Sequence, residues 1–194
     1  MYLSIWIVRR GQTARTQERA PSPLCAACMA TQNASIKRLA PPFAHFIVDG
    51  FNFVEPDVHH YFLTHAHSDH TCGLHGSFDL GTIYCSSLTA RVVRATIGVR
   101  AKLIQTLEVG DTIEVEGVAI TALDAGHCPG SLMFLFAHVA SGATALHTGD
   151  CRASPSIVAA AADACAKVAR SPPVDGDADR ATRGEGGKIG RAHV

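Results

Sequence analysis

The chain has 194 residues, with 17 basic and 17 acidic side chains and a formal net charge of zero. Apolar residues make up 47% of the sequence, which is enough for the core of one domain. The seven cysteines are scattered and odd in number, so they predict free thiols in a reducing compartment and argue against a secreted, disulfide-built protein.

The first 40 residues predict a basic, disordered leader. They carry six Lys or Arg and one acid, Glu18. The apolar stretch 2–8 is too short to span a bilayer, and the basic pair Arg9-Arg10 follows it, so we expect neither a membrane anchor nor a secretory signal. A basic arm that contacts nucleic acid is the alternative to a solvated leader.

Residues 41–156 predict a domain of short strands with one helix. Apolar runs and alternations favour strands at residues 46–49, 61–64, 82–85, 112–115, 118–123, 131–138 and 143–147. Residues 87–97 predict a helix that Ser86 or Ser87 caps. Mixed strands and few helices indicate an α/β sandwich, with loops that carry functional side chains at one end of the strands.

Four potential metal ligands follow the apolar run 61–63 within six residues: His65, His67, Asp69 and His70. If residues 61–64 form a strand, His65 and His67 emerge on one face and can reach one ion. Asp69 and His70 can face a second ion or hold a water molecule. Neutral imidazole with carboxylate is the ligand mix of catalytic zinc, and a solvated histidine-rich loop is the alternative.

Two later loops supply further candidate ligands in the same way. His127 lies in a Gly/Pro-bounded loop after strand 118–123, and Asp150 follows strand 143–147. Each alone would be an ordinary loop residue, but together with the first motif they predict one metal site. Strand alternation puts His147 on the side opposite Asp150, so we expect a packed strand histidine there rather than a ligand.

The order and the amino-acid sequences of these segments resemble those of the DNA cross-link repair nucleases, the group that includes Artemis. Four segments carry the resemblance: IVDGF at 47–51, FLTHAHSDHT at 62–71, DAGHCPGS at 124–131 and HTGD at 147–150. The resemblance runs from about residue 41 to residue 156. It implies a metallo-β-lactamase-type αβ/βα sandwich of the α/β class, present as its first half only, without the inserted β-CASP domain of that group.

The resemblance also implies a function. Members of the group are nuclear, zinc-dependent 5′-to-3′ DNA exonucleases of interstrand cross-link and double-strand break repair, so DNA with a 5′ end is the expected partner. One or two zinc ions are expected. By position, the first ion would be held by His65, His67, His127 and Asp150. Asp69 and His70, with Asp150 bridging, would hold a second ion or organise the nucleophilic water. Asp69 would be the catalytic proton acceptor, and Asp49 would orient ligands through hydrogen bonds.

Departures from the family pattern keep two alternatives open. Gly126 stands where the family usually has Asn, and Cys151 where it usually has an aromatic residue. The sequence of residues 125–127 is closer to that of RNA-processing β-CASP nucleases. The sequence of residues 128–131 favours the DNA cross-link repair nucleases. Residues 41–155 contain eleven acids and five bases, a poor match to DNA by themselves. The second alternative is a non-catalytic fragment that binds zinc weakly at most.

The C-terminal region, 157–194, predicts an alanine-rich helix over 157–169 followed by a disordered tail. The last six residues, IGRAHV, are what a common sequencing-adapter oligonucleotide gives when translated. We hypothesise that the tail is an assembly artefact joined to a truncated gene. Genomic reads that continue in frame through this hexapeptide would contradict that hypothesis.

Overall fold

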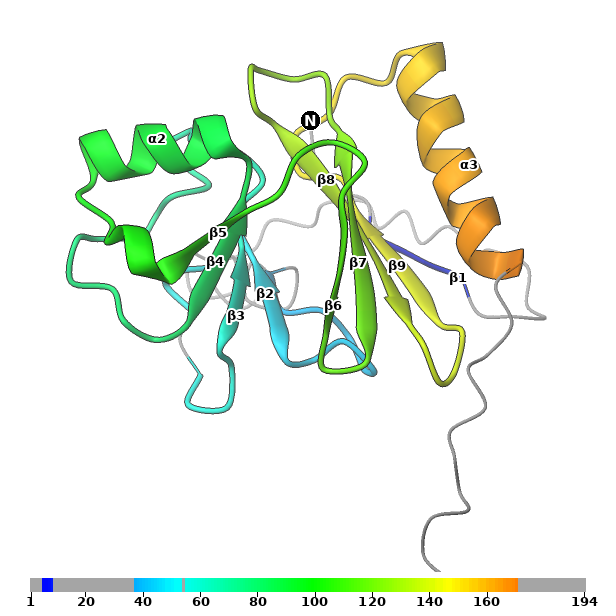
Figure 1. Cartoon of the computed structure of the whole chain (residues 1–194), viewed down its shortest axis with the longest axis horizontal. Helices are drawn as coiled ribbons and strands as arrows, with labels where there is room; N and C mark the ends of the chain where they lie inside the picture. The colour runs from blue at the N-terminus through cyan, green and yellow to red at the C-terminus, as the bar shows by residue number, and fades with distance from the viewer. Residues whose placement is uncertain (1–4, 9–36, 54, 171–194) are drawn as a thin grey trace, which may run out of the picture.

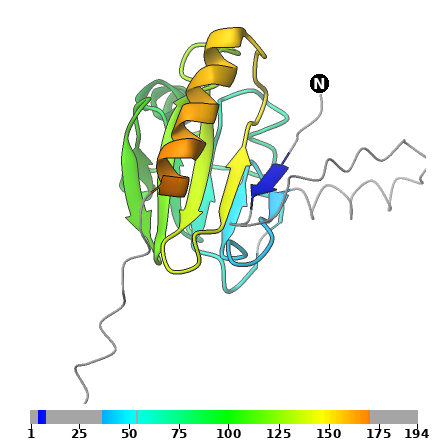
Figure 2. The same ribbon diagram turned by 90° about the vertical axis from the view of Figure 1, so that its right-hand side faces the viewer.

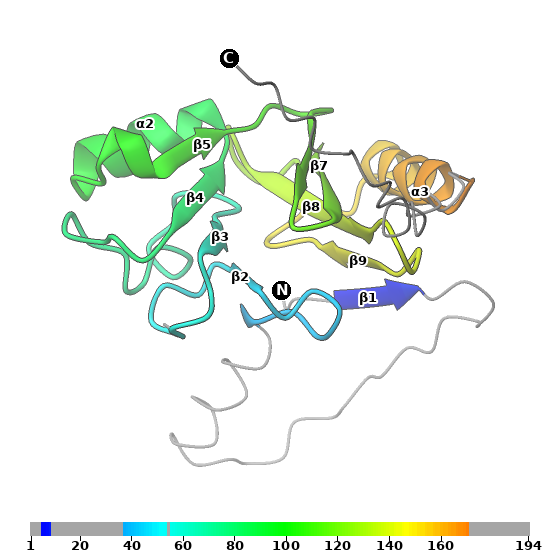
Figure 3. The same cartoon turned by 60° about the horizontal axis from the view of Figure 1, so that its bottom comes forward.

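The computed structural model describes residues 5–8, 37–53 and 55–170. Two β-sheets face each other, and one helix covers the outer face of each sheet (Figure 1). Seen from below, the layers follow one another as helix, sheet, sheet and helix (Figure 3). This arrangement is an α/β sandwich, and the predicted fold class is confirmed.

The first sheet is parallel and has the order β2-β3-β4-β5. Its strands are β2 (Phe46–Val48), β3 (His60–Phe62), β4 (Thr82–Cys85) and β5 (Ile104–Thr106). Between β4 and β5 the chain forms helix α2 (Ser87–Thr96) and the short 3-10 helix η1 (Ala101–Leu103). Because parallel strands end at the same edge of a sheet, the loops after β2 and β3 begin side by side.

The second sheet is antiparallel and has the order β1-β9-β8-β7-β6. Its strands are β1 (Ile5–Val8), β6 (Thr112–Val115), β7 (Val118–Asp124), β8 (Leu132–His138) and β9 (Thr144–His147). A tight turn joins β6 to β7, with positive φ angles at Glu116 (50°) and Gly117 (73°). Such angles are typical of two-residue hairpin loops.

Aromatic side chains fill the space between the two sheets. Phe62 lies with its ring centroid 5.1 Å from both Phe134 and Phe136, and Phe46 packs 5.5 Å from Phe136. All four rings are fully buried. Edge-to-face packing of this kind adds to the free energy gained by burying such large apolar surfaces. The aromatic core therefore holds the sheets, and the loops that leave them, in a fixed relation.

Both outer sheet faces are also apolar, which explains the two covering helices. On the parallel sheet, Ala90 and Val93 of α2 pack in one buried cluster with Ile83. On the antiparallel sheet, helix α3 (Pro155–Arg170) packs through Ile157 and neighbouring side chains against Leu135 and other sheet residues. Figure 2 shows α3 lying across this outer face. Strand β8 is consequently buried on both sides.

The structure differs from the sequence predictions at the ends of the domain. Ile5–Val8, expected within a disordered leader, pairs with β9 as strand β1. The predicted helix at 157–169 is present as α3, but it packs on the sheet, so the domain does not end at residue 156. The remaining leader, 9–36, and the predicted tail, 171–194, lie outside the described residues. Among the residues the structure describes, no helix has the length and apolar character needed to cross a membrane.

Candidate metal centre

The candidate ligands and Asp49, which contacts them, come from four loops that meet at one edge of the sandwich. Asp49 follows β2, the histidine-rich loop follows β3, His127 lies between β7 and β8, and Asp150 follows β9. The histidine-rich loop is tied to the other sheet, because the Leu132 N–H donates to the Thr64 carbonyl oxygen at 2.9 Å. This bond joins the end of the parallel sheet to the start of β8 and brings ligands from both sheets together.

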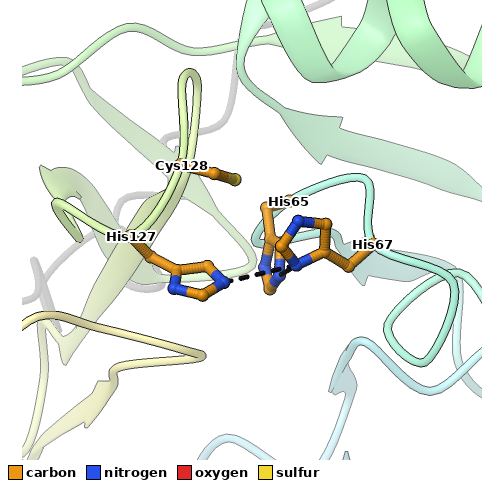
Figure 4. Close-up of side chains that lie close together, drawn as sticks. All are labelled: His65, His67, His127 and Cys128. Carbon is orange, nitrogen blue, oxygen red and sulfur yellow. Dashed lines mark hydrogen bonds between the residues drawn. The ribbon is translucent and has the colours of Figure 1, made fainter.

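Three imidazole nitrogens converge at this edge (Figure 4). His65 Nε2 lies 2.9 Å from His67 Nδ1, and His67 Nδ1 lies 3.3 Å from His127 Nε2. With Cys128 Sγ they form a group of four donor atoms within 4.8 Å of one another. Nitrogen lone pairs this close together repel unless a proton or a cation lies between them. The donor set therefore fits a metal ion.

A second group of donors adjoins the first and consists of His65, His70 and Asp150. One carboxylate oxygen of Asp150 lies 3.6 Å from His70 Nε2, and the other lies 3.6 Å from His127 Nε2. Asp150 thus spans the two groups. The structure brings together five of the six predicted ligands in these two groups.

Asp69 is the predicted ligand that joins neither group. Its side chain is 76% exposed, and its carboxylate lies 3.6 Å from His70 Nε2. Its position at the mouth of the site is open to solvent. The roles of Asp69 as second-ion ligand and as proton acceptor remain predictions.

Asp49 holds the histidine-rich loop through three hydrogen bonds. Thr64 donates its N–H to Oδ1 at 2.8 Å and its hydroxyl to Oδ2 at 2.7 Å. His70 Nδ1 lies 2.7 Å from Oδ2. Because an ionised carboxylate only accepts, His70 Nδ1 carries the proton, and the Nε2 lone pair faces Asp150. Asp49 therefore sets the tautomer of His70.

Thr64 connects the same carboxylate to His65. Its hydroxyl oxygen, which donates to Asp49, lies 3.0 Å from His65 Nδ1 and can accept the proton of that nitrogen. The lone pair of His65 Nε2 is then available at the ligand cluster. Thr64 was not among the predicted site residues. Its place directly before the motif was a possible signal, but its contact with Asp49 depends on the pairing of β2 with β3.

Burial and hydrogen bonding set the charges at the site. Burial alone would raise the pKa of Asp49, but the hydrogen bond from His70, together with charges on His147 and His70, lowers it below its usual value. Burial opposes a charge on His70, yet the bond to Asp49 raises its pKa. Burial, with repulsion from His70, lowers the pKa of His65 to about 4. His65 is therefore neutral near pH 7, which is the form that binds metal.

His147 is fully buried in β9 and lies in neither donor group, as strand alternation predicts. Its Nδ1 accepts a hydrogen bond from the Gly149 N–H at 3.2 Å. Burial lowers its pKa to about 4, against an opposing effect of Asp49. This histidine is a buried neutral group beside the site.

His147 predicts a loss of stability in acid. The unfolded chain titrates near pH 6.5 and the folded chain near pH 4, so the unfolded state binds more protons between these values. With a chelator present, the free energy of unfolding of the protein should be highest above pH 6.5 and should fall as the pH drops toward 4. His147→Asn, which keeps an acceptor for Gly149, should reduce this slope by up to about 1.4 kcal/mol per pH unit. Equal slopes in denaturant titrations of both proteins would contradict the assignment.

Gly149, in the turn after β9, lies close to Thr64 of the candidate site, so we expect a larger residue at this position to disturb the site. Its φ is 52°, and an added Cβ would lie 2.8 to 2.9 Å from side-chain atoms of Thr64. Gly149→Ala should therefore displace Thr64 and weaken metal binding, in addition to about 1–2 kcal/mol of backbone strain. Gly110→Ala is the control, since its φ is also positive and a Cβ there meets nothing within 4 Å. Competition with a chelator for zinc should show weakened binding in the first variant alone.

Taken together, the fold and the donor set define a metal-site protein built on an α/β sandwich. No family model matches the sequence. Among curated proteins, the chain is 42% identical over 117 residues to the DNA cross-link repair 1A protein of Gallus gallus, covering 60% of this chain and 12% of that protein. It is 42% identical over 105 residues to the 5′ exonuclease Apollo of Danio rerio, covering 50% and 18%.

A plant protein shows the same similarity. Over 114 residues, the chain is 40% identical to the DNA cross-link repair protein SNM1 of Arabidopsis thaliana, covering 58% of this chain and 23% of that protein. The resemblance to DNA cross-link repair proteins is confirmed over about 60% of the chain. The matched part spans less than a quarter of the length of each of these relatives.

Solved structures that resemble the fold include the metallo-β-lactamase SMB-1, with a TM-score of 0.42, 18% identity and coverage of 55% of this chain and 52% of that one. Another is a flavo-di-iron protein of Thermotoga maritima, with a TM-score of 0.39, 15% identity and coverage of 47% and 27%.

Proposed function

We propose that this chain is the metal-binding part of a zinc-dependent nuclease that hydrolyses DNA from the 5′ end in interstrand cross-link and double-strand break repair. The observation that carries the proposal is the convergence of His65 Nε2, His67 Nδ1 and His127 Nε2 beside the Asp150 carboxylate. We take DNA as the substrate because the similar proteins include a DNA cross-link repair protein and a 5′ exonuclease. A nuclear location follows from that role.

Zinc is the proposed metal because of the donor chemistry. Imidazole nitrogens with a carboxylate are common ligands of catalytic zinc, whereas magnesium prefers oxygen donors and retains waters. His65 is neutral near pH 7, which is the form that binds metal, and the bond from His70 Nδ1 to Asp49 directs Nε2 of His70 toward Asp150. The two carboxylate oxygens of Asp150 face different donor groups, one toward His70 and one toward His127, which favours two neighbouring ions over one.

When bound, zinc lowers the pKa of a water molecule from about 15.7 to about 7 and offsets negative charge on a phosphate. Residues of the chain supply the remaining functions. We propose that the exposed carboxylate of Asp69 accepts the proton of the attacking water, since it lies next to His70 at the mouth of the site. Asp49 has a positioning role, because it contacts Thr64 and His70 from the buried side.

An RNA-processing nuclease is the second candidate, because of Gly126. The structure supplies a packing reason for this glycine. Its φ is 60°, and an added Cβ would lie 2.3 Å from Ile157 Cδ1 of helix α3. Any larger residue there requires the end of the Ile157 side chain to move, so the positive φ and this contact together favour glycine independently of the substrate. The DNA function is therefore the stronger proposal.

The experiment compares cleavage of two single-stranded substrates by the purified chain with zinc. A 5′-phosphorylated DNA oligonucleotide labelled at its 3′ end should shorten progressively from the 5′ end, and an RNA oligonucleotide of the same sequence should be cut more slowly. His67→Ala should abolish the cleavage. His75→Ala, at an exposed histidine outside both donor groups, should leave it unchanged.

Each other outcome favours a stated alternative. Faster cleavage of the RNA would support the RNA-processing nuclease. Weak zinc binding at most, without cleavage of either substrate, would support the non-catalytic fragment. Cleavage that persists in His67→Ala would come from a contaminant or another site, and would overturn the assignment of the centre.

A further inference from the structure

The bases of residues 41–155 are concentrated in one segment. Between residues 80 and 107 the chain has four bases and no acid. The rest of 41–155 holds all eleven acids and one base, Arg152. The four bases are exposed, and we call them the basic strip: Arg91, Arg94, Arg100 and Lys102. The charge that matches DNA poorly on average is thus divided between a basic strip and an acidic remainder.

The basic strip lies on the outer side of the parallel sheet. Helix α2 buries Ala90 and Val93 against this sheet, so Arg91 and Arg94 lie toward solvent. The other two bases follow at η1, which leads into β5. In Figure 3, α2 and α3 lie on opposite sides of the two sheets. The positive charge is therefore confined to the α2 side of the molecule.

The structure gives the basic strip no acidic partner. Arg100 donates a hydrogen bond to the Phe78 carbonyl oxygen at 2.8 Å. The other three bases make no side-chain ion pair or hydrogen bond with any residue that the structure describes. Glu108, the first acid after the segment, accepts the Ser87 N–H at 3.3 Å at the start of α2 rather than pairing with a base. Like charges three or four residues apart on a helix repel each other, so an external anion would stabilise this arrangement.

The start of α2 adjoins the candidate metal centre. The Ser86 hydroxyl, which caps α2, donates to the Gly130 carbonyl oxygen at 2.6 Å, in the loop that carries His127. Arg91 is five residues further along the chain, about 7.5 Å from Ser86 at the rise of 1.5 Å per residue of a helix. A polymer bound at the metal centre can therefore continue onto the basic strip.

We propose that the basic strip binds the phosphate backbone of the DNA strand whose end lies at the metal centre. The inference rests on the proposed nuclease function and adds a docking surface to it. Arginine and lysine neutralise phosphates without reading the bases, which suits an enzyme that removes nucleotides of any sequence. The acidic remainder of the domain repels a polyanion, so the strand is directed along α2 and η1.

The experiment measures the affinity of the full chain for a fluorescent single-stranded DNA oligonucleotide over a range of salt concentrations. A chelator is present, so no cleavage occurs. Each phosphate contact to a single strand contributes about 0.7 to the slope of log affinity against log salt. Replacing Arg91, Arg94 and Lys102 together by Gln should therefore reduce the slope by about 2 and weaken binding at low salt by at least about tenfold.

A matched pair of single variants is the control. Arg91→Gln and Lys167→Gln each remove one exposed charge from a covering helix, but Lys167 lies on α3. Arg91→Gln should reduce the slope by about 0.7, whereas Lys167→Gln should leave it unchanged. An unchanged slope in the triple variant would overturn the basic strip as the docking surface. So would tighter binding of polyglutamate than of DNA with the same number of charges, because the partner would then be an acidic protein.

A second measurement separates this inference from the proposed function. Zinc content and hydrolysis of bis(p-nitrophenyl) phosphate report on the metal centre alone, since this small phosphodiester does not extend to the basic strip. The triple variant should retain both, which also shows that it is folded. If the unmodified chain shows neither but its salt slope still falls in the triple variant, the proposed nuclease function is overturned and the DNA-binding role of the strip stands.

Discussion

His67→Ala is expected to abolish high-affinity metal binding without unfolding the protein. His67 Nδ1 is the central donor, because it lies 2.9 Å from His65 Nε2 and 3.3 Å from His127 Nε2. Without it, the remaining nitrogens have no third imidazole to complete the coordination. The side chain itself is exposed, so its removal creates no cavity, and the free energy of unfolding of the metal-free protein should change by about 0.5 kcal/mol or less.

The measurement is zinc content after dialysis against a weak chelator, together with denaturant unfolding of the metal-free chain. The control is His75→Ala, an exposed loop histidine whose Nδ1 contacts Ser77 Oγ at 2.9 Å. It should bind zinc like the unmodified protein. If His67→Ala retains full zinc content, the ligand assignment is wrong.

The sequence predicted most of the fold because its signals are local. Apolar runs and alternations located β7, β8 and β9 to within a residue or so. Ser86 caps α2 by accepting the Thr89 N–H at 3.1 Å. Strand β5 was missed. It has three residues, one half-buried and two exposed, so it carries no apolar alternation.

Long-range pairing explains the other difference in the fold. Ile5 pairs with His147 across the sheet, although more than 140 residues separate them. The apolar stretch at the N-terminus is too short to indicate a partner by itself. Nothing in its local composition distinguishes an edge strand from a leader.

The same distinction between local and long-range signals applies to the candidate site. Residues whose motifs are short, such as His65, His67 and His70, could be identified from spacing alone. The position of Cys128 among the donors could not, because it depends on how the loop after β7 is held against α2. The exposure of Asp69 likewise depends on the course of the loop rather than on its sequence.

Asp49→Asn should impair both stability and metal binding, although Asp49 lies in neither donor group. Asp49 has a φ of 51°, which asparagine tolerates, so the substitution preserves the backbone and the size of the side chain. Only the charge and one acceptor are lost. The carboxylate is fully buried, and its pKa is held below the usual value mainly by the hydrogen bond from His70, against the effect of burial.

The loss of the acceptor forces a change of tautomer. In the unmodified protein, Asp49 Oδ2 accepts from the Thr64 hydroxyl and from His70 Nδ1. An amide NH₂ at this position is a donor, so His70 Nδ1 must become an acceptor and its proton must move to Nε2. Nε2 then has no lone pair for a metal. Loss of such an orienting partner typically weakens metal affinity by about 10–100-fold.

Stability should fall for the same reason. Removing one partner of a buried charged hydrogen-bonded pair typically costs about 3–5 kcal/mol. The control is Asp57→Asn, since Asp57 pairs with Arg38 at the surface, where such pairs contribute about 0–1 kcal/mol. Chelator competition and denaturant unfolding should therefore separate the two variants in both quantities. If Asp49→Asn instead binds zinc as tightly as the unmodified chain, Asp49 does not set the tautomer of His70, and His70 is not a ligand in the form proposed here.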